Sequence, residues 1–200
     1  IEYLYLLLLK VNFSEIKTVI YGCALIFSEI KNISLFYMEY IKLGNSDLKV
    51  SKICLDCMGF GDSQNGQHIW CLSYEESKEI IKYALDEGIN FFDTSMVYQN
   101  GTSEEYTGRI LKELRPRNEY IIATKIAPKG AYPDKEGMSV HDYVKECLNN
   151  SLRRLQVEYI DLYILHWWDY KNSINEYLES FHEFIKEGKI KYIGISNCHA

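Results

Sequence analysis

Three ionisable residues stand at the ends of mainly apolar runs in this sequence. Asp93, Lys125 and His166 each close such a run, and Tyr98 follows the first of them by a few residues. A carboxylate, an ammonium, an imidazole and a phenol are all groups that can hold or transfer a proton. Taken singly, each is more often an incidental polar end of a strand than a catalytic group, so their arrangement decides the question.

The three strand ends share one parity. Side chains alternate between the two faces of a strand, so each ionisable residue lies on the face of the apolar residues two, four or six places before it. These are Ile89 and Phe91 in the first run, Ile121 and Ala123 in the second, and Ile160, Leu162 and Ile164 in the third. Adjacent strands lie about 5 Å apart, which places Asp93 and Lys125 within reach of an ion pair. Three matching strand ends in succession favour a functional site.

The elements that must position these residues alternate regularly from Met38 onward. A β-hairpin is predicted over 39–43 and 49–51, because a turn cluster separates two short strand-like runs. Ser73 precedes Glu76 by three residues, which is a capping-box signature at the start of a helix. The expected strands cover 52–58, 89–94, 120–126, 159–167 and 190–196, and the expected helices 73–88, 103–114, 139–155 and 174–188.

This alternation is typical of a parallel sheet with helices outside it. The first strand is not followed by a Gly-rich G-x-G-x-x-G turn, which counts against a dinucleotide-binding Rossmann domain. A (β/α)8 TIM barrel is therefore preferred, and its chemistry belongs at the carboxyl ends of the strands. Only five of its strands can be counted, whereas such barrels take about 250 residues. We expect a barrel truncated after about the fifth strand, which alone should be poorly stable and inactive.

Two domains of unequal character are expected. Residues 38–200 form the partial barrel, and residues 1–37 are an N-terminal extension outside the fold, with Met38 as the hypothetical natural start. An amphipathic N-terminal helix is the alternative. No apolar run reaches the ~18–20 residues that span a bilayer, and no secretory signal is visible. The six scattered cysteines then favour reduced thiols and a cytoplasmic protein.

Composition excludes some partners and disfavours a metal site. The net charge of −6 and pI near 5.4 argue against nucleic acid or an anionic membrane, since both require a basic face. Cys54 and Cys57 are expected on opposite faces of a strand, where they cannot share a metal. A metal-dependent hydrolase ranks last, because four histidines sit in loops or helices without ligand-like spacing: His68, His141, His182 and His199.

Four motifs in order resemble those of the aldo-keto reductase family. Residues 88–94, 97–98 and 101–108 are similar to its G-x-N-F-F-D-T-A-x-x-Y…G-x-S-E-E…G signature. The segment 121–125 resembles the strand that carries the family's lysine, 161–169 its D-L-Y-x-x-H segment, and 194–197 its G-x-S-N segment. Within the family, the resemblance favours the branch of potassium-channel β-subunit-like reductases, because of the G-T-S-E-E form of residues 101–105 and the long loop 62–72. Met96 departs from the pattern.

The resemblance implies roles for particular residues. Asp93, Tyr98, Lys125 and His166 would be catalytic: Tyr98 as general acid, with its pKa lowered by Lys125, Asp93 keeping Lys125 charged, and His166 orienting the carbonyl. Cofactor contacts would come from Gly59, Phe60, Asp93, Ser196 and Asn197. Phe60 and Trp167 would line the substrate pocket, and Trp168 is as readily assigned to packing.

The implied activity is NADPH-dependent reduction of an aldehyde or ketone to an alcohol. NAD is not excluded, because the family's phosphate contacts come largely from strands this sequence lacks. The partner is a small carbonyl substrate, and the sequence does not predict an oligomeric state. Two alternatives stay open: a cofactor-sensing regulatory subunit, and an inactive truncated fragment.

Overall fold

The computed structural model describes residues 38–198, so the predicted extension over 1–37 lies outside the described residues. The predicted hairpin is present: β1 (Tyr40–Lys42) pairs antiparallel with β2 (Lys49–Ser51). Five parallel strands then form one sheet in sequential order, as the alternation predicted. They are β3 (Leu55–Asp56), β4 (Phe91–Asp93), β5 (Ile121–Ile126), β6 (Ile160–Leu165) and β7 (Ile190–Ile195).

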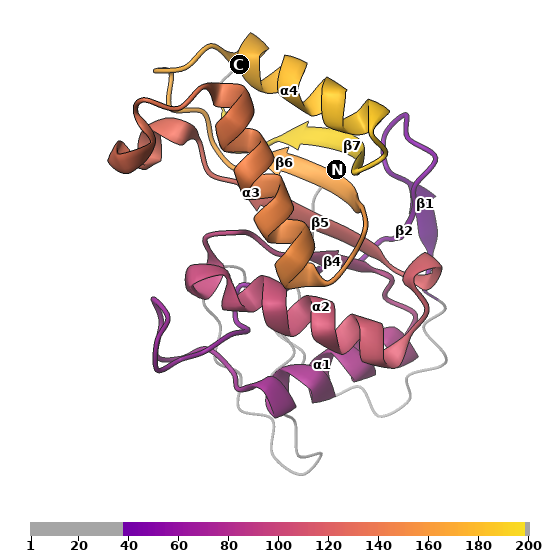
Figure 1. Ribbon diagram of the computed structural model, residues 1–200. Coiled ribbons are helices and arrows are strands. Elements are labelled where there is room, and N and C mark those ends of the chain that lie inside the picture. The colour runs from indigo at the N-terminus through magenta and orange to yellow at the C-terminus, as the bar shows by residue number, and fades with distance from the viewer. Residues whose placement is uncertain (1–37, 199–200) are drawn as a thin grey trace.

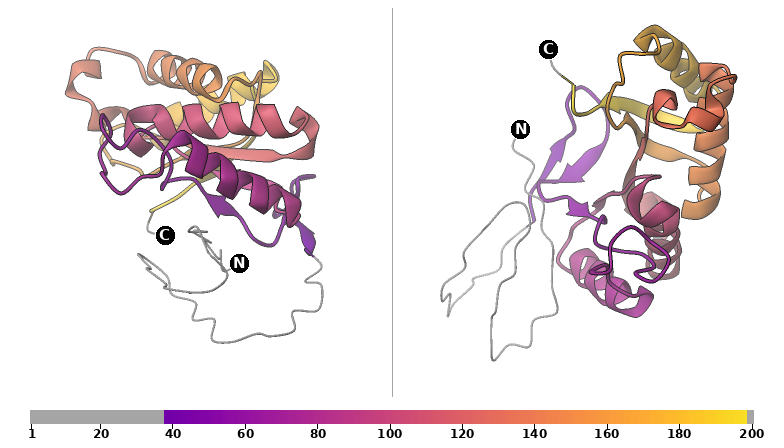
Figure 2. Two further views of the ribbon diagram at one scale, coloured as in Figure 1. Left: turned by 90° about the horizontal axis from the view of Figure 1, so that it is seen from below. Right: turned by 90° about the vertical axis from the view of Figure 1, so that its left-hand side faces the viewer.

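Helices cover one face of this sheet, and the hairpin lies on the other side, at the amino end of the strands (Figures 1 and 2). The helices are α1 (Tyr74–Asp86), α2 (Thr102–Leu114), α3 (Val140–Leu155) and α4 (Ile174–Lys186). Short 3-10 turns join the larger elements, at η1 (Tyr98–Gly101), η2 (Arg117–Glu119), η3 (Lys129–Ala131) and η4 (Pro133–Lys135). Each connection returns the chain to the amino end of the sheet before the next strand begins. The carboxyl ends of all five parallel strands therefore lie at one end of the sheet.

Local sequence signals account for the helix ends. The predicted capping box is confirmed, because the Ser73 and Glu76 side chains each hydrogen-bond to the backbone N–H of the other. Ser139 caps α3 with a single bond, its Oγ accepting the Asp142 N–H at 3.0 Å. Gly88 follows α1 at φ 88°, a left-handed conformation that glycine adopts without steric cost.

Two apolar cores lie on the two faces of the sheet. The larger core packs the outward side chains of the strands against the helices. The smaller one packs the inward side chains against the hairpin; its buried members are Leu48, Val50, Cys54, Phe91, Ile121 and Ala123. Cys54 belongs to the smaller core and Cys57 to the larger, so the prediction that they face opposite sides is confirmed.

The hairpin closes the amino end of the strands. The Ser51 N–H donates to the Asn90 side chain at 2.7 Å, just before β4. The Tyr40 hydroxyl donates to the Gly88 carbonyl at 2.7 Å. With this end covered, the opposite end of the sheet, where β3–β7 terminate, is the open one. We call it the mouth.

Two sequence-based expectations about the strands need correction. The first strand was predicted over 52–58 but covers only Leu55–Asp56, because the Asp56 carboxylate accepts the Met58 N–H and turns the chain. Ile89 and Ile160 belong to the larger core and not to the inward face. Ile89 lies before the first residue of β4, and Ile160 is the first residue of β6. At these strand starts, the alternation of side chains between the two faces did not predict the side on which each one packs.

Gly108 marks the contact between α2 and α3. A Cβ at this position would lie 2.1 Å from the Leu155 carbonyl oxygen and 2.4 Å from the Leu155 Cα, both backbone atoms. Gly108→Ala therefore has to push the two helices apart. We expect it to lower the free energy of unfolding of the full-length protein by about 1–3 kcal/mol, measured by urea denaturation.

Gly137→Ala is the matched control. No heavy atom lies within 4 Å of a Cβ built there, and its backbone is not left-handed. The control should leave the urea midpoint almost unchanged. Equal midpoints for the two variants would contradict the tight crossing of α2 and α3.

Candidate active site

Lys125 is the centre of the group at the mouth. It lies near the carboxyl end of β5, and its Nζ donates to Asp93 Oδ2 at 2.5 Å, to the Thr94 carbonyl at 2.9 Å and to the Tyr98 hydroxyl oxygen at 3.2 Å. The ammonium group thus uses all three of its N–H donors. The predicted ion pair between adjacent strands is present, with both side chains 8% exposed.

The surroundings of this pair keep it charged. The pKa of Asp93 is raised to about 6, because burial raises it by more than Lys125 lowers it, and the carboxylate is therefore mainly ionised at pH 7. Burial also lowers the pKa of the Lys125 ammonium, but Asp93 and Tyr98 outweigh that effect and the net shift is upward. A lysine that stays cationic beside a phenol is the arrangement that favours loss of the phenolic proton.

Tyr98 enters the mouth from η1, directly beneath the Lys125 ammonium. Lys125 lowers its pKa, as expected, yet the net shift of the tyrosine pKa is upward. Burial is the largest cause, and the charges of Asp56 and Asp93 add to it. The expectation of a net lowering is therefore wrong for this structure, because burial of the phenol raises its pKa by more than the Lys125 ammonium lowers it.

His166 follows β6 and completes the group. Its ring meets the Tyr98 ring edge-on, with centroids 5.8 Å apart and an interplanar angle of 81°. Burial, followed by the charge of Lys125, lowers the pKa of His166 to about 4. The imidazole is consequently neutral at pH 7, with one N–H and one bare nitrogen.

The next strand brings two more polar side chains to the same place. Ser196 Oγ and Asn197 Nδ2 both donate to the His166 carbonyl oxygen, at 2.5 and 2.9 Å. Trp167 is half-buried, and its ring centroid lies 5.0 Å from that of His166. These three residues therefore border the group formed by Asp93, Tyr98, Lys125 and His166.

Phe60 has a different position from the one expected, whereas Trp168 agrees with a packing role. Phe60 is fully buried in the larger core, at 0% exposure, so its side chain provides no wall for a ligand at the mouth. The parity of a two-residue strand could not predict that direction. The Gly59 carbonyl accepts the Leu72 N–H at 2.8 Å, which holds the start of the following loop. Trp168 packs against the larger core and donates to the Asn172 carbonyl, in agreement with a packing role.

Asp56 is a carboxylate at the mouth that the sequence pattern did not predict. Asp56 ends β3 directly beside Asp93 in the parallel register. Its pKa is raised by burial, while its Met58 N–H contact and Lys125 lower it. Lys125 has no N–H left for it, so the mouth carries two carboxylates and one ammonium. The sequence did carry a signal for it, because Asp56 is an acidic residue at the end of the strand that precedes β4.

Gln99 is a second residue with a role that the sequence pattern did not predict. Its side chain, 1% exposed, accepts the N–H groups of Gln67 and His68 and donates to the Asp62 and His68 carbonyls. These four bonds tie the loop after β3 to the residue next to Tyr98. The loop is thereby held at the rim of the mouth.

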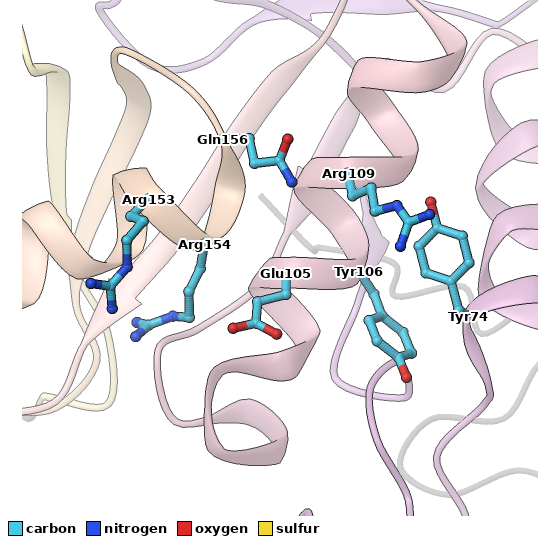
Figure 3. A pocket seen from close by; sticks show the side chains of 7 residues that line it. All are labelled: Tyr74, Glu105, Tyr106, Arg109, Arg153, Arg154 and Gln156. Atoms are coloured by element: carbon cyan, nitrogen blue, oxygen red, sulfur yellow. The ribbon is translucent and has the colours of Figure 1, made fainter.

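One hollow lies away from the mouth, on the outer side of the helices. It has a volume of about 450 Å³ and is lined by Tyr74 from α1, by Glu105, Tyr106 and Arg109 from α2, and by Arg153, Arg154 and Gln156 at the end of α3 (Figure 3). Arg154 is bound to the buried Glu104 at 2.6 Å and Arg109 to Glu113 at 3.1 Å. Its arginines are thus largely committed to ion pairs, and we place the chemistry at the mouth.

Residues 38–198 contain neither a candidate metal site nor a candidate membrane span. Within that range, no group of three or more His, Cys, Asp or Glu has an arrangement that could hold a metal ion. No helix in the same range combines the length and the apolar character that a bilayer crossing requires.

A parallel sheet with outer helices, a hairpin under its amino end and ionisable groups at its carboxyl end is the architecture of part of a TIM barrel. Residues 57–200 match the sequence model of the Aldo/keto reductase family, and the chain belongs to that family. Its architecture is therefore the aldo-keto reductase type of TIM barrel, of which five strands are described.

Individual relatives agree with this assignment. A probable aldo-keto reductase 1 of Glycine max is 40% identical, over 80% of this chain and 45% of the relative. A versiconal hemiacetal acetate reductase of Aspergillus parasiticus is 34% identical, over 82% and 52%. The structure of aldo-keto reductase AKR11C1 from Bacillus halodurans, in its holo form, superposes with a TM-score of 0.65 at 35% identity, covering 80% of this chain and 50% of that one. The chain thus spans about half the length of the relatives it matches.

Proposed function

We propose that the protein reduces an aldehyde or ketone to an alcohol, with NADPH as hydride donor and Tyr98 as general acid. One observation carries the proposal: Lys125 Nζ contacts Asp93 and the Tyr98 hydroxyl at once, with the His166 ring edge-on to the tyrosine. This arrangement supplies a proton donor, a cation that stabilises the donor after it has lost its proton, and a neutral hydrogen-bonding group beside it.

Each residue has a distinct part in the proton transfer. The Tyr98 hydroxyl donates its proton to the oxygen of the substrate as negative charge develops there. Lys125 stabilises the resulting phenolate through its 3.2 Å contact. Asp93 holds the ammonium in place and balances its charge. His166, neutral at pH 7, donates a hydrogen bond to the same substrate oxygen and fixes its orientation.

The residues beyond β7 fit a nicotinamide carboxamide. The side-chain oxygens of Ser196 and Asn197 can accept the N–H groups of a carboxamide, while their donor groups bond to the His166 carbonyl. Both side chains lie beside His166, next to the proposed acid. When bound, the reduced cofactor supplies the hydride. We propose NADPH as the cofactor and leave NADH as an outcome of the test.

The substrate class follows from the same place in the fold. Trp167 offers an aromatic, half-exposed wall next to His166, which suits a small carbonyl compound with an apolar body. A cytoplasmic location belongs to the same proposal, supported by the free thiols of Cys54, Cys57, Cys71, Cys147 and Cys198.

The test is the oxidation of reduced nicotinamide by the purified full-length protein. Absorbance is followed with NADPH and, separately, with NADH, in the presence of 4-nitrobenzaldehyde, an aliphatic aldehyde or a ketone. The expected result is carbonyl-dependent oxidation, faster with NADPH. Cofactor binding would be seen as quenching of tryptophan fluorescence. Binding without turnover of any carbonyl would contradict the proposed reductase and support a cofactor-sensing regulatory subunit.

Residues 38–200 alone are expected to be inactive and poorly stable. Among the described strands, β3 and β7 each pair on one side only, and Ile193 and Ile195 of β7 are exposed. An open parallel edge and an uncovered apolar face favour association with other surfaces. The purified segment should bind the dye ANS strongly and melt without a cooperative transition. A sharp transition together with NADPH-dependent turnover would contradict this expectation.

A further inference from the structure

Ser95 lies behind the ring of His166, where its hydroxyl contacts three groups. The side chain is fully buried, two residues after the end of β4. Its Oγ lies 3.1 Å from His166 Nδ1, 3.3 Å from the Lys125 carbonyl oxygen and 3.4 Å from the Val97 backbone nitrogen. Ser95 thus contacts the imidazole on the side that faces away from Nε2.

The contact with Ser95 can decide which ring nitrogen of His166 carries the proton. Burial and the nearby Lys125 lower the pKa of the imidazole to about 4, so at pH 7 the ring carries a single proton, on Nδ1 or on Nε2. Which nitrogen carries it is set by the hydrogen bond that the other nitrogen makes. Among the described residues, Ser95 is the one side chain that bonds to Nδ1.

The Ser95 hydroxyl has one proton to give, and two acceptors are near it. The Lys125 carbonyl already accepts the Met96 N–H at 3.1 Å, so it has a donor without the serine. His166 Nδ1 is the closer acceptor. The Val97 N–H in turn donates to Ser95 Oγ, which leaves the hydroxyl proton free to turn toward the ring.

We propose that Ser95 donates its hydroxyl proton to His166 Nδ1 and thereby holds the ring proton on Nε2. Ser95 is then a positioning residue, which acts through the imidazole without touching the substrate. This inference deepens the proposed function, on which its catalytic consequence rests. In the tautomer with the proton on Nε2, that nitrogen donates to the carbonyl oxygen. In the other tautomer, a bare nitrogen would face the oxygen and repel it.

The test reads the tautomer directly. Full-length protein labelled with ¹⁵N-histidine is studied by NMR at pH 7, where the chemical shift of each ring nitrogen shows whether it carries a proton. His166 is assigned from the signal that is lost in His166→Asn. The wild-type protein should show a proton on Nε2, and Ser95→Ala should move part or all of it to Nδ1. Ser95→Thr, which keeps a hydroxyl, should retain the wild-type tautomer.

Activity provides the second readout. With NADPH and 4-nitrobenzaldehyde, Ser95→Ala should lower kcat about tenfold, the loss of one hydrogen bond, with a smaller change in KM. Ser180→Ala is the control: this serine is also buried, but it bonds to the Glu176 carbonyl within α4, far from the mouth. It should leave both the spectrum and kcat unchanged, which excludes a general effect of removing a buried hydroxyl.

The outcomes separate this inference from the proposed function. A wild-type proton on Nδ1, or a proton that stays on Nε2 in Ser95→Ala, would overturn the role of Ser95 even if the protein reduces carbonyls. A tautomer that shifts as expected in a protein without reductase activity would support Ser95 and overturn the proposed function instead.

Discussion

Tyr98→Phe should lower kcat for carbonyl reduction by about 10²–10⁴-fold, the contribution of a positioned general acid. The substitution removes one oxygen and keeps the ring, so its edge-on packing against His166 is retained. Binding of NADPH, measured by fluorescence titration, should change little, because the phenol oxygen acts on the substrate. Stopped-flow measurement of a single turnover would show whether the loss lies in the chemical step.

Tyr170→Phe is the matched control for this experiment. Tyr170 is 60% exposed, and its ring lies 4.3 Å from that of Trp168 at an interplanar angle of 34°. The three Lys125 N–H donors go to Asp93, Thr94 and Tyr98, so Tyr170→Phe removes the same atom without removing a bond to Lys125, and kcat should stay at the wild-type value. Turnover by Tyr98→Phe at a rate close to that of this control would exclude Tyr98 as the acid.

Lys125→Met should be comparably damaging, with a loss in kcat of about 10²–10³-fold. Without the ammonium, the phenolate formed when Tyr98 gives up its proton has no cation beside it. Asp93 also loses its partner, and because burial already raises its pKa to about 6, it should take up a proton at neutral pH. The mouth would then hold a neutral acid in place of an ion pair.

The pH dependence of this variant has a definite sign. Reduction needs the protonated phenol, so the rate falls as pH rises through the Tyr98 pKa. Lys125 lowers that pKa, against the upward effect of burial. Its removal should therefore move the alkaline limb of the pH–rate profile to higher pH. Lys145→Met, at an exposed site on α3, should leave the profile in place. An unmoved limb in Lys125→Met would reduce the lysine to a structural role.

Much of the mouth could be predicted from local pattern. Asp93, Lys125 and His166 end successive apolar runs with the same parity, and parallel strands joined by helices bring equivalent ends together. The helix starts at Ser73 and Ser139 could also be predicted from nearby residues, because each capping side chain bonds to a backbone N–H only three residues away. The structure agrees with these expectations because each depends on residues close together in the chain.

Other features had no local signal. The direction of Phe60 depended on where a two-residue strand ends, and Asp56 itself shortens that strand through its bond to the Met58 N–H. The contact of Ser95 with His166 joins residues 71 positions apart. Neither periodicity nor motif spacing describes which side chain will occupy the space behind an imidazole.

The sequence by itself therefore determined the family, the order of the elements and the four ionisable residues at the mouth. Alternation, capping and motif spacing are properties of neighbouring residues. Only the tertiary structure decided the electrostatics: the upward net shift of the Tyr98 pKa, the neutral His166 and the second carboxylate at Asp56. The physical reason is that desolvation and hydrogen-bond partnership depend on everything packed around a group, and those neighbours come from every part of the chain.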